Sequence, residues 1–237
     1  MRQAGSTKRR SKGWFILNRD SLNTIDYYFI TDTNLSQRGV LSDVEQSIGA
    51  GCRIIQYREK TSYTGKIVQE GYQIKQLCRE KALFIVNDRI DVALAVDADG
   101  VHIGQDDMPY ASARKILGSG KIIGVTVHDE TEAVAAEKVG ADYVGLSPIF
   151  ATNTKEDAGN ACGVSMVARV REATRLPIIA IGGVTKANAG EVIRAGADAV
   201  CAISAVVASD DVYREVKEFM SLIQQAKRDR EKLSVKQ

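Results

Sequence analysis

The chain has 237 residues, 44% hydrophobic and 26% charged, which is the composition of an ordinary globular protein. This length allows one large core or two small ones, and one α/β domain is the simplest fit. Its 32 basic and 30 acidic side chains nearly cancel, so bulk charge gives no basis for nucleic-acid or membrane binding. No apolar run approaches the roughly 18 residues of a membrane span, and the basic start lacks the apolar segment of a signal peptide. We therefore expect a cytoplasmic protein without a nucleic-acid or membrane partner, in which any anion site is local.

Cysteine and histidine are too few and too scattered to suggest a zinc site or a disulfide framework. These residues are Cys52, Cys78, Cys162, Cys201, His102 and His128. The cysteines form no C-x-x-C pair, and two histidines make imidazole-rich metal chemistry a poor fit. A bound metal would then be a hard cation held by carboxylates, which favours Mg²⁺.

The first 23 residues are basic and have little periodicity beyond a short apolar patch at 14–17. We interpret residues 1–23 as a solvated tail ending in a short docking segment. An arm that binds nucleic acid is the sharper alternative, but a single short basic run is more often a solvated tail.

From Tyr27 onward, short β-branched or apolar runs alternate with segments of helical period, the pattern of a parallel sheet with crossover helices. The expected strands are 28–31, 53–57, 83–86, 100–103, 122–126, 143–146, 178–181 and 199–203. The segments with the helical pattern include 64–81, 130–138, 164–173, 186–194 and 211–227.

A weak internal repeat refines this prediction. Short glycine- or aspartate-containing segments precede four of the expected strands, and they start at Gly49, Asp97, Gly140 and Gly196. Strand number, length and repeat together predict an α/β fold, a single (β/α)8 TIM-type barrel over residues 24–230, with a short basic N-terminal extension and a C-terminal tail at 231–237. A doubly wound open sheet is less favoured, because no G-x-G-x-x-G follows the first strand.

The second expected strand ends in alternating polar residues. Because strand side chains alternate between faces, Gln56, Arg58 and Lys60 share one side if the extended backbone continues. A guanidinium and an ammonium converging from one strand end can engage neighbouring phosphoryl oxygens. The other interpretation of this stretch alone is a solvated strand end with surface charges.

Polar residues also follow the third and fourth expected strands. Asp88 and Asp107 would reach the same mouth of the barrel, where a pair of carboxylates beside cations suits Mg²⁺ on a diphosphate. Their alternative role is helix capping, and for Asp88 we favour the metal. Asp106 is expected to be solvated or to lie behind the direct ligands of the metal.

The last strands carry the features of a phosphate site. Gly182-Gly183 closes the seventh expected strand, and Ser204 follows the eighth, where this fold usually binds phosphate. A simple tight turn would also explain the glycines. His128 is interpreted as a hydrogen-bonded residue of a packed site, ahead of a general base, and His102 as structural.

These residues give the chain a specific resemblance to the thiamine-phosphate synthase family over nearly all of 27–227. The resemblance rests on residues 56–60 (QYREK), 87–88 (ND), 100–107 (GVHIGQDD), 143–155 (YVGLSPIFATNTK), 181–183 (IGG) and 203–204 (IS). It implies a TIM-type barrel that uses Mg²⁺ to join hydroxymethylpyrimidine diphosphate to thiazole phosphate, or to its carboxylated form, with release of diphosphate. The implied partners are these small molecules, and a homodimer remains open.

The resemblance also implies roles by position. The pyrimidine diphosphate would be bound by Gln56, Tyr57, Arg58, Glu59, Lys60, Asn87, Thr126 and Lys155. The thiazole phosphate would be bound by Thr152, Asn153, Thr154, Gly183, Ile203 and Ser204. Asp88 and Asp107 would hold Mg²⁺, and Arg58, Lys60 and Lys155 would be the catalytic cations.

Two positions depart from the family pattern: Thr126 stands where serine is usual, and Ala151 stands where proline is common. The first change keeps the hydroxyl, and the second loosens the expected placement of the loop after the sixth strand. No protein nucleophile is needed, because Mg²⁺ and the cations can stabilise charge on departing diphosphate.

Two other functions remain open at this stage. A related thiazole tautomerase would share the barrel and the thiazole phosphate site, but would not need the cations and carboxylates seen here. A regulator or nucleic-acid binder acting through the basic tail would leave the barrel mouth without turnover.

Overall fold

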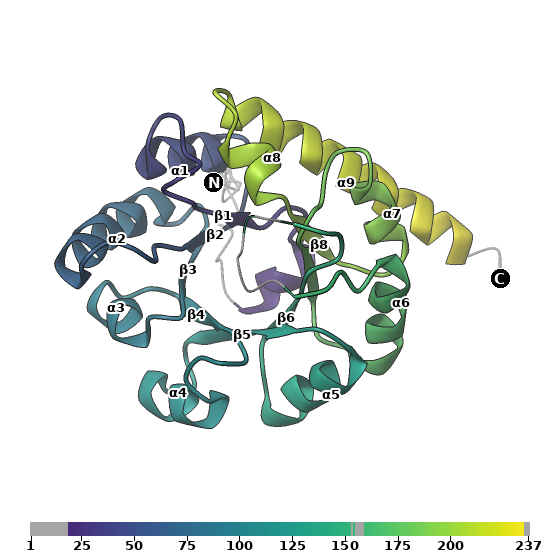
Figure 1. Cartoon of the computed structure of the whole chain (residues 1–237), viewed down its shortest axis with the longest axis horizontal. Coiled ribbons are helices and arrows are strands. Elements are labelled where there is room, and N and C mark those ends of the chain that lie inside the picture. The colour runs from purple at the N-terminus through teal and green to yellow at the C-terminus, as the bar shows by residue number, and fades with distance from the viewer. Residues whose placement is uncertain (1–18, 153, 155–158, 235–237) are drawn as a thin grey trace, which may run out of the picture.

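The computed structural model of the chain describes residues 19–152, 154 and 159–234. Eight parallel strands form one sheet in sequence order, and a parallel bridge between Tyr27 and Val200 joins β8 back to the start of β1. The resulting ring, surrounded by helices in Figure 1, confirms the (β/α)8 barrel. The strands are β1 (Phe29–Ile30), β2 (Ile54–Tyr57), β3 (Leu83–Asn87), β4 (Gly100–Ile103), β5 (Ile122–Val127), β6 (Tyr143–Leu146), β7 (Ile178–Ile181) and β8 (Ala199–Cys201).

The helices cover the outside of this ring (Figure 1). They are α1 (Val40–Gly49), α2 (Thr64–Cys78), α3 (Ile90–Ala95), α4 (Tyr110–Leu117), α5 (Glu130–Val139), α6 (Val164–Ala173), α7 (Ala189–Arg194), α8 (Ile203–Val207) and α9 (Val212–Ser234). All five helical segments named from the sequence are present, whereas α1, α3, α4 and α8 are additional. None of the helices within 19–152, 154 and 159–234 is both long and apolar enough to cross a membrane.

The end of the eighth strand was predicted wrongly. The strand was expected to reach Ile203, but β8 ends at Cys201 and Ile203 begins α8. The β-branched residues there suggest a strand, yet Val206 and Val207 are buried in α8, which packs against α9. Tertiary packing therefore overrides local strand propensity at this point, as it often does.

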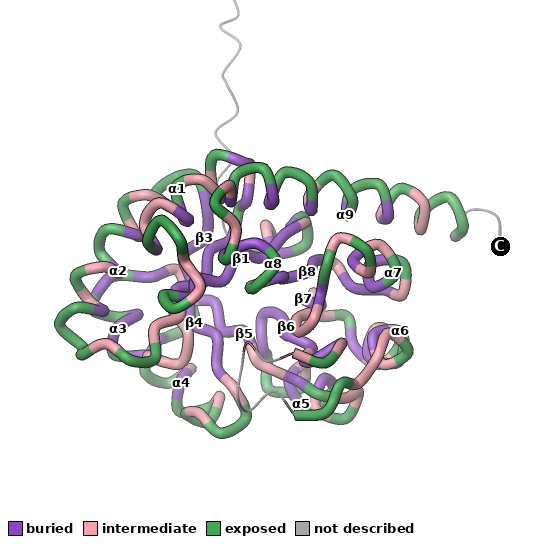
Figure 2. The backbone as a smooth tube through the Cα atoms, turned by 45° about the horizontal axis from the view of Figure 1, so that its top comes forward, coloured by how far each residue is buried: buried purple, intermediate pink, exposed green. Residues whose placement is uncertain are grey.

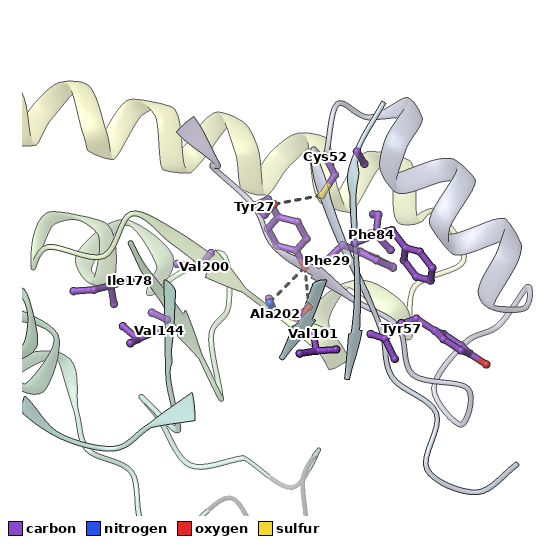
Figure 3. Packing of buried hydrophobic residues seen from close by; sticks show 14 of the residues in the cluster. Tyr27, Phe29, Cys52, Tyr57, Phe84, Val101, Val144, Ile178, Val200 and Ala202 are labelled. Atoms are coloured by element: carbon purple, nitrogen blue, oxygen red, sulfur yellow. Dashed lines mark hydrogen bonds between the residues drawn. The ribbon is translucent and has the colours of Figure 1, made fainter. Parts of the chain in front are cut away.

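Alternation along the strands produces two apolar layers. Inward residues such as Ile54, Ile85 and Ile179 fill the barrel, and outward residues such as Phe84 and Val144 pack under the helices. Figure 2 shows the strands buried and the outer helix faces exposed, and Figure 3 shows part of the outward layer. The outward layer packs the strands against the helices.

The opposite end of the barrel from the strand carboxyl ends is closed by a short 3-10 helix, η1 (Arg19–Thr24). Its Leu22 is buried with the inward layer, and the Arg19 guanidinium pairs with Asp142 at 2.5 Å. Residues 19–23, which were expected to belong to the tail, therefore pack against the barrel, and α9 extends into the expected C-terminal tail.

Candidate active site

One cavity opens at the carboxyl ends of the strands, and most of the site residues expected from the sequence line it. They are Gln56, Arg58, Lys60, Asn87, Asp88, Thr126, Thr152, Thr154, Gly183, Ile203 and Ser204. They come from the ends of β2, β3, β5, β6 and β7 and from the start of α8. The fold thus brings residues almost 150 positions apart in the chain to the same mouth.

Three expected residues, Tyr57, Glu59 and Asp107, are not among those that line this cavity, and two lie outside the described residues. Tyr57 points to the helix layer, where its hydroxyl donates to Glu70 Oε2 at 2.6 Å. Glu59 accepts hydrogen bonds from Thr33, Thr61 and Ser62 in the adjoining loops. The two residues outside the described part of the chain are Asn153 and Lys155.

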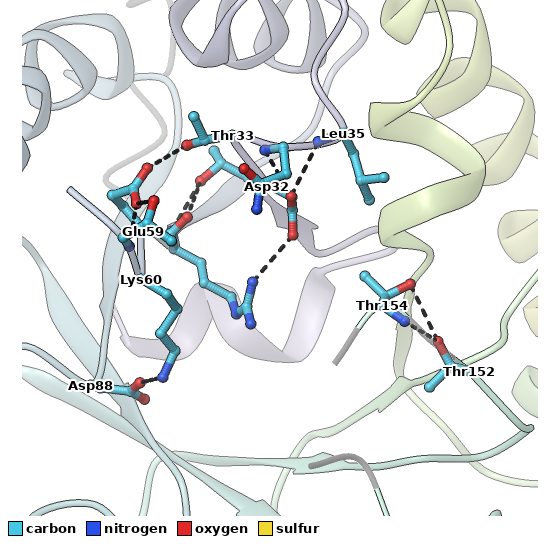
Figure 4. A network of polar contacts seen from close by, with 12 residues as sticks. Asp32, Thr33, Leu35, Glu59, Lys60, Asp88, Thr152 and Thr154 are labelled. Atoms are coloured by element: carbon cyan, nitrogen blue, oxygen red, sulfur yellow. Dashed lines mark hydrogen bonds and ion pairs between the residues drawn. The ribbon is translucent and has the colours of Figure 1, made fainter. Parts of the chain in front are cut away.

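Arg58 is held in place by the end of β1. Its backbone N–H donates to Thr31 Oγ1 at 2.9 Å, and its guanidinium contacts Asp32 Oδ2 at 3.2 Å. Asp32 is buried and its other oxygen accepts the amides of Asn34 and Leu35, as Figure 4 shows. A charge-assisted contact to a carboxylate fixed in this way orients the guanidinium before any ligand arrives. Asp32 was not predicted as a site residue.

Lys60 and Asp88 form an ion pair across the cavity mouth (Figure 4). Asp88 has a positive φ of 58°, and its N–H donates to His102 O at 2.8 Å, which turns the chain sharply after β3. Burial raises the pKa of Asp88, and the nearby Asp107 carboxyl adds to this rise. The two carboxylates are therefore neighbours.

This geometry bears on the two roles considered for the aspartates. The residue that precedes α3 is Arg89 and the residue that precedes α4 is Pro109, so neither Asp88 nor Asp107 occupies the cap position of the following helix. Asp107 Oδ2 instead accepts the Gly104 N–H at 2.7 Å. Two adjacent carboxylates with oxygen donors suit Mg²⁺, which commonly takes one or two carboxylates and completes its shell with water and substrate phosphate.

The conformation and packing of the Gly182-Gly183 turn explain why both residues are glycine. Both residues have positive φ, 95° and 62°. A Cβ on Gly182 would lie 2.6 Å from Pro148 Cβ, and one on Gly183 would lie 2.6 Å from Phe150 Cβ. The loop after β6 thus lies directly on the turn, and Phe150 N donates to Gly182 O at 3.0 Å. Glycine is required here for close packing as well as for conformation.

That packing positions two hydroxyls on the opposite side of the mouth from Lys60. Thr154 N donates to Thr152 Oγ1 at 3.2 Å, and both side chains line the cavity (Figure 4). The site therefore has two unlike halves: charged side chains at the ends of β2 and β3, and hydroxyls with glycine backbone after β6 and β7.

The cavity also contains a residue that was considered only structural. His102 lines it, with Nε2 2.9 Å from Thr126 Oγ1 and Nδ1 3.1 Å from the Tyr143 hydroxyl. A signal for this was available in the sequence, because His102 occupies an inward position of β4 one residue from Val101, which faces the helices. His128, in contrast, contacts Glu132 and does not line the cavity.

The chain is similar to known proteins over most of its length. Residues 27–206 match the family described as Thiamine monophosphate synthase. The thiamine-phosphate synthase of Methanosarcina mazei is 53% identical over 95% of this chain and 94% of its own length. That of Methanosarcina barkeri is 56% identical over 87% of this chain and 94% of its own length.

A solved structure is also similar to this chain. The thiamine phosphate pyrophosphorylase from Pyrococcus furiosus superposes with a TM-score of 0.80 at 38% identity, covering 86% of this chain and 98% of that protein. The family match over residues 27–206 includes all eight strands, among them those that contribute to the cavity. The chain belongs to the thiamine monophosphate synthase family.

Proposed function

We propose that this protein is a thiamine-phosphate synthase that joins 4-amino-2-methyl-5-hydroxymethylpyrimidine diphosphate to 4-methyl-5-(2-phosphoethyl)thiazole, or its carboxylated form, to give thiamine phosphate and diphosphate in the cytoplasm. The observation that carries the proposal is the two-sided cavity. A diphosphate suits the side with Arg58, Lys60 and the paired aspartates, and a phosphate monoester suits the side with Thr152 and Thr154.

The charged half suits departure of the leaving group. Arg58, already oriented by Asp32, and Lys60 would donate hydrogen bonds to diphosphate oxygens as the carbon–oxygen bond breaks. Lys155 is proposed to join them, on the basis of its position in the family motif. Mg²⁺ bound by Asp88 and Asp107 would neutralise further charge on the diphosphate. The products then form without a covalent bond to the protein.

The inner part of the cavity suits the pyrimidine. Gln56 and Thr126 offer polar groups there, and Asn87 lies at the end of β3 beside Asp88. Apolar inward residues, among them Ile30 and Ile181, surround these groups. Such walls would keep water from an electron-poor methylene carbon while the thiazole nitrogen attacks it.

The glycine half suits the second substrate. Gly183 and the first residues of α8, Ile203 and Ser204, would offer backbone and hydroxyl donors to the thiazole phosphate. Thr152 and Thr154 would contact it from the facing loop, and Asn153 is assigned there by the family motif.

The test is to mix both substrates with Mg²⁺ and measure thiamine phosphate and diphosphate. Equal amounts of the two products are expected, and neither should form if either substrate is left out. A thiazole tautomerase would act on a thiazole phosphate alone, and a binding protein would release no diphosphate. Either result would reject the proposed reaction.

A further inference from the structure

Five polar side chains form a continuous hydrogen-bonded chain through the inside of the barrel, below the cavity. Gln56 Nε2 lies 2.9 Å from the Tyr28 hydroxyl, which lies 2.7 Å from the Tyr143 hydroxyl. His102 bridges Tyr143 and Thr126 with its two ring nitrogens. Both tyrosines and Gln56 are 1% exposed. Gln56, His102 and Thr126 line the cavity, and neither tyrosine does. The chain thus begins and ends at the ligand site and is buried between these ends.

Two glycines in the strands leave room for the rings of this hydrogen-bonded chain. A Cβ on Gly124 would lie 2.0 Å from Tyr143 Cζ, and one on Gly145 would lie 3.0 Å from His102 Cε1. The two rings stack with their centroids 5.5 Å apart. Glycine weakens a strand interior, because it loses more backbone entropy on folding than other residues and has no side chain to pack. Two strand glycines that make room for these rings therefore indicate that the rings have a purpose beyond filling space.

The order of protons along the chain follows from its donors and acceptors. Burial raises the pKa of both phenols, so each carries one proton at neutral pH. Because the amide nitrogen of Gln56 donates to Tyr28, the Tyr28 proton goes to Tyr143 and the Tyr143 proton goes to His102 Nδ1. The His102 proton is then on Nε2 and is donated to Thr126 Oγ1.

This order determines what the two ends offer to a ligand. The amide nitrogen of Gln56 is engaged, so its carbonyl oxygen is the group that can accept a hydrogen bond in the cavity. Thr126 accepts from His102, so its hydroxyl proton is available for donation. The reverse order would require Gln56 to turn its amide, and would offer a donor at Gln56 in place of an acceptor.

We propose that Tyr28, Tyr143 and His102 are positioning residues that fix this proton order, so that the cavity selects a pyrimidine with an amino group over one with an oxo group. The selectivity rests on the proposed function, which supplies an aminopyrimidine as substrate. The amino group donates to the Gln56 carbonyl oxygen, and an acceptor on the same substrate receives the Thr126 proton. An oxo group would face that carbonyl oxygen as a second acceptor, and a buried site rejects such a mismatch strongly.

The proton order can be measured without substrate, from the ¹⁵N shifts of labelled histidine. The chain has only two histidines, so the spectrum of His128→Gln assigns the signals. His102 is expected as the Nε2–H tautomer, with Nδ1 as the acceptor from Tyr143. Tyr143→Phe keeps the ring but removes the proton donated to Nδ1, so the tautomer should become mixed. Tyr27→Phe is the matched control, because Tyr27 is a similarly buried phenol whose hydroxyl donates to Ala202 O and contacts none of the five side chains.

The selectivity is measured as the ratio of kcat/KM for the aminopyrimidine diphosphate to that for its 4-oxo analogue. Tyr143→Phe should lower the ratio by on the order of tenfold, mainly through KM, since one orienting hydrogen bond is lost. Tyr27→Phe should keep the wild-type ratio, because its hydroxyl contacts none of the five side chains. Tyr28→Phe repeats the test if Tyr143→Phe does not fold.

Two results would overturn the proposal: an Nδ1–H tautomer in the wild-type protein, or a wild-type ratio in a folded Tyr143→Phe or Tyr28→Phe variant. Absence of product from both pyrimidines would reject the proposed function and the selectivity together. The tautomer of the resting protein would still decide the proton order, so the two failures are distinguishable.

Discussion

The two halves of the cavity mouth are built by different physical means. At the ends of β2 and β3, charged side chains are already paired within the protein: Arg58 with Asp32, and Lys60 with Asp88. After β6 and β7, the backbone itself forms the site, because Gly182 and Gly183 let the 147–151 loop pack against the turn. Charge pairing leaves the first half adjustable when a ligand brings its own charges, whereas close packing makes the second half rigid.

In the charged half, we expect the largest loss of activity from substitution of the two aspartates. Asp88→Asn and Asp107→Asn keep the size of the side chain, and asparagine tolerates the positive φ at position 88. If these residues hold Mg²⁺, turnover should fall by about a hundredfold, which is about 3 kcal/mol, and the Mg²⁺ midpoint should rise. The measurement is a Mg²⁺ titration of thiamine phosphate formation.

Asp106→Asn is the control for these variants, because Asp106 is an exposed neighbour of Asp107. It should keep the wild-type rate and midpoint. The metal assignment would be wrong if Asp88→Asn and Asp107→Asn kept full activity with an unchanged midpoint.

In the rigid half, substitutions that disturb the packing should lower the stability of the protein. Gly183→Ala introduces a Cβ 2.6 Å from Phe150 Cβ at a φ of 62°. Together, left-handed strain and overlap should lower the free energy of unfolding by about 2–4 kcal/mol. Gly140→Ala is the control, because Gly140 is in the left-handed region with φ 89° and ψ 33°, but its added Cβ would meet only the Tyr110 hydroxyl at 3.5 Å, an ordinary contact. It should lose only about 1 kcal/mol in a urea titration. Equal losses in the two variants would show that the contact with the loop is unimportant.

Much of the fold could be predicted from the sequence. The strands are confirmed to within two residues at each end, because β-branched runs between turn residues produce a strong local signal. The end of β8 could not be found in this way, because the β-branched Ile203 favours a strand locally although it lies in α8. Its conformation is decided by packing against α9, which is distant in the sequence.

The placement of residues at the cavity could be predicted where it depended on strand ends, and less so where it depended on side-chain orientation. Gln56, Arg58 and Lys60 reach the cavity, as the alternation of strand side chains predicted. Tyr57, assigned by resemblance, faces the helices, and the same alternation would have indicated this. The contact of His102 with Tyr143 depends on the register and curvature of β4, β5 and β6, which no local pattern encodes.

A smaller effect should come from the carboxylate that orients Arg58. Asp32→Asn can still accept the amides of Asn34 and Leu35, but loses the charge that faces the guanidinium. We expect kcat/KM to fall by roughly tenfold. In a double-mutant cycle, Asp32→Asn should have little further effect once Arg58 is replaced by Met. A tenfold loss that persists without Arg58 would mean that Asp32 acts through another group.

The smallest expected effect concerns Glu59, an acid of the charged half whose contacts are within the protein. Burial alone would raise its pKa, but hydrogen bonds from Thr33, Thr61 and Ser62 outweigh this and lower the pKa from 4.5 to about 2. A group with a lowered pKa in the folded state contributes stability above its unfolded pKa, and this contribution is lost as the pH falls. The relevant window is therefore from about pH 4.5 down to about pH 2.

Glu59→Gln should accordingly be less stable than the wild type at pH 7, by under about 1 kcal/mol because the side chain is only partly buried. The difference should shrink as the pH is lowered from 5 to 3 in a series of urea titrations. Thr33→Val removes one donor to the same carboxylate, so it should show the same trend at a smaller size. A difference that stays constant with pH would mean that Glu59 acts by shape and not by charge. In that case, the hydrogen-bonded loop next to Arg58 would resemble the rigid glycine half more than the adjustable charged half.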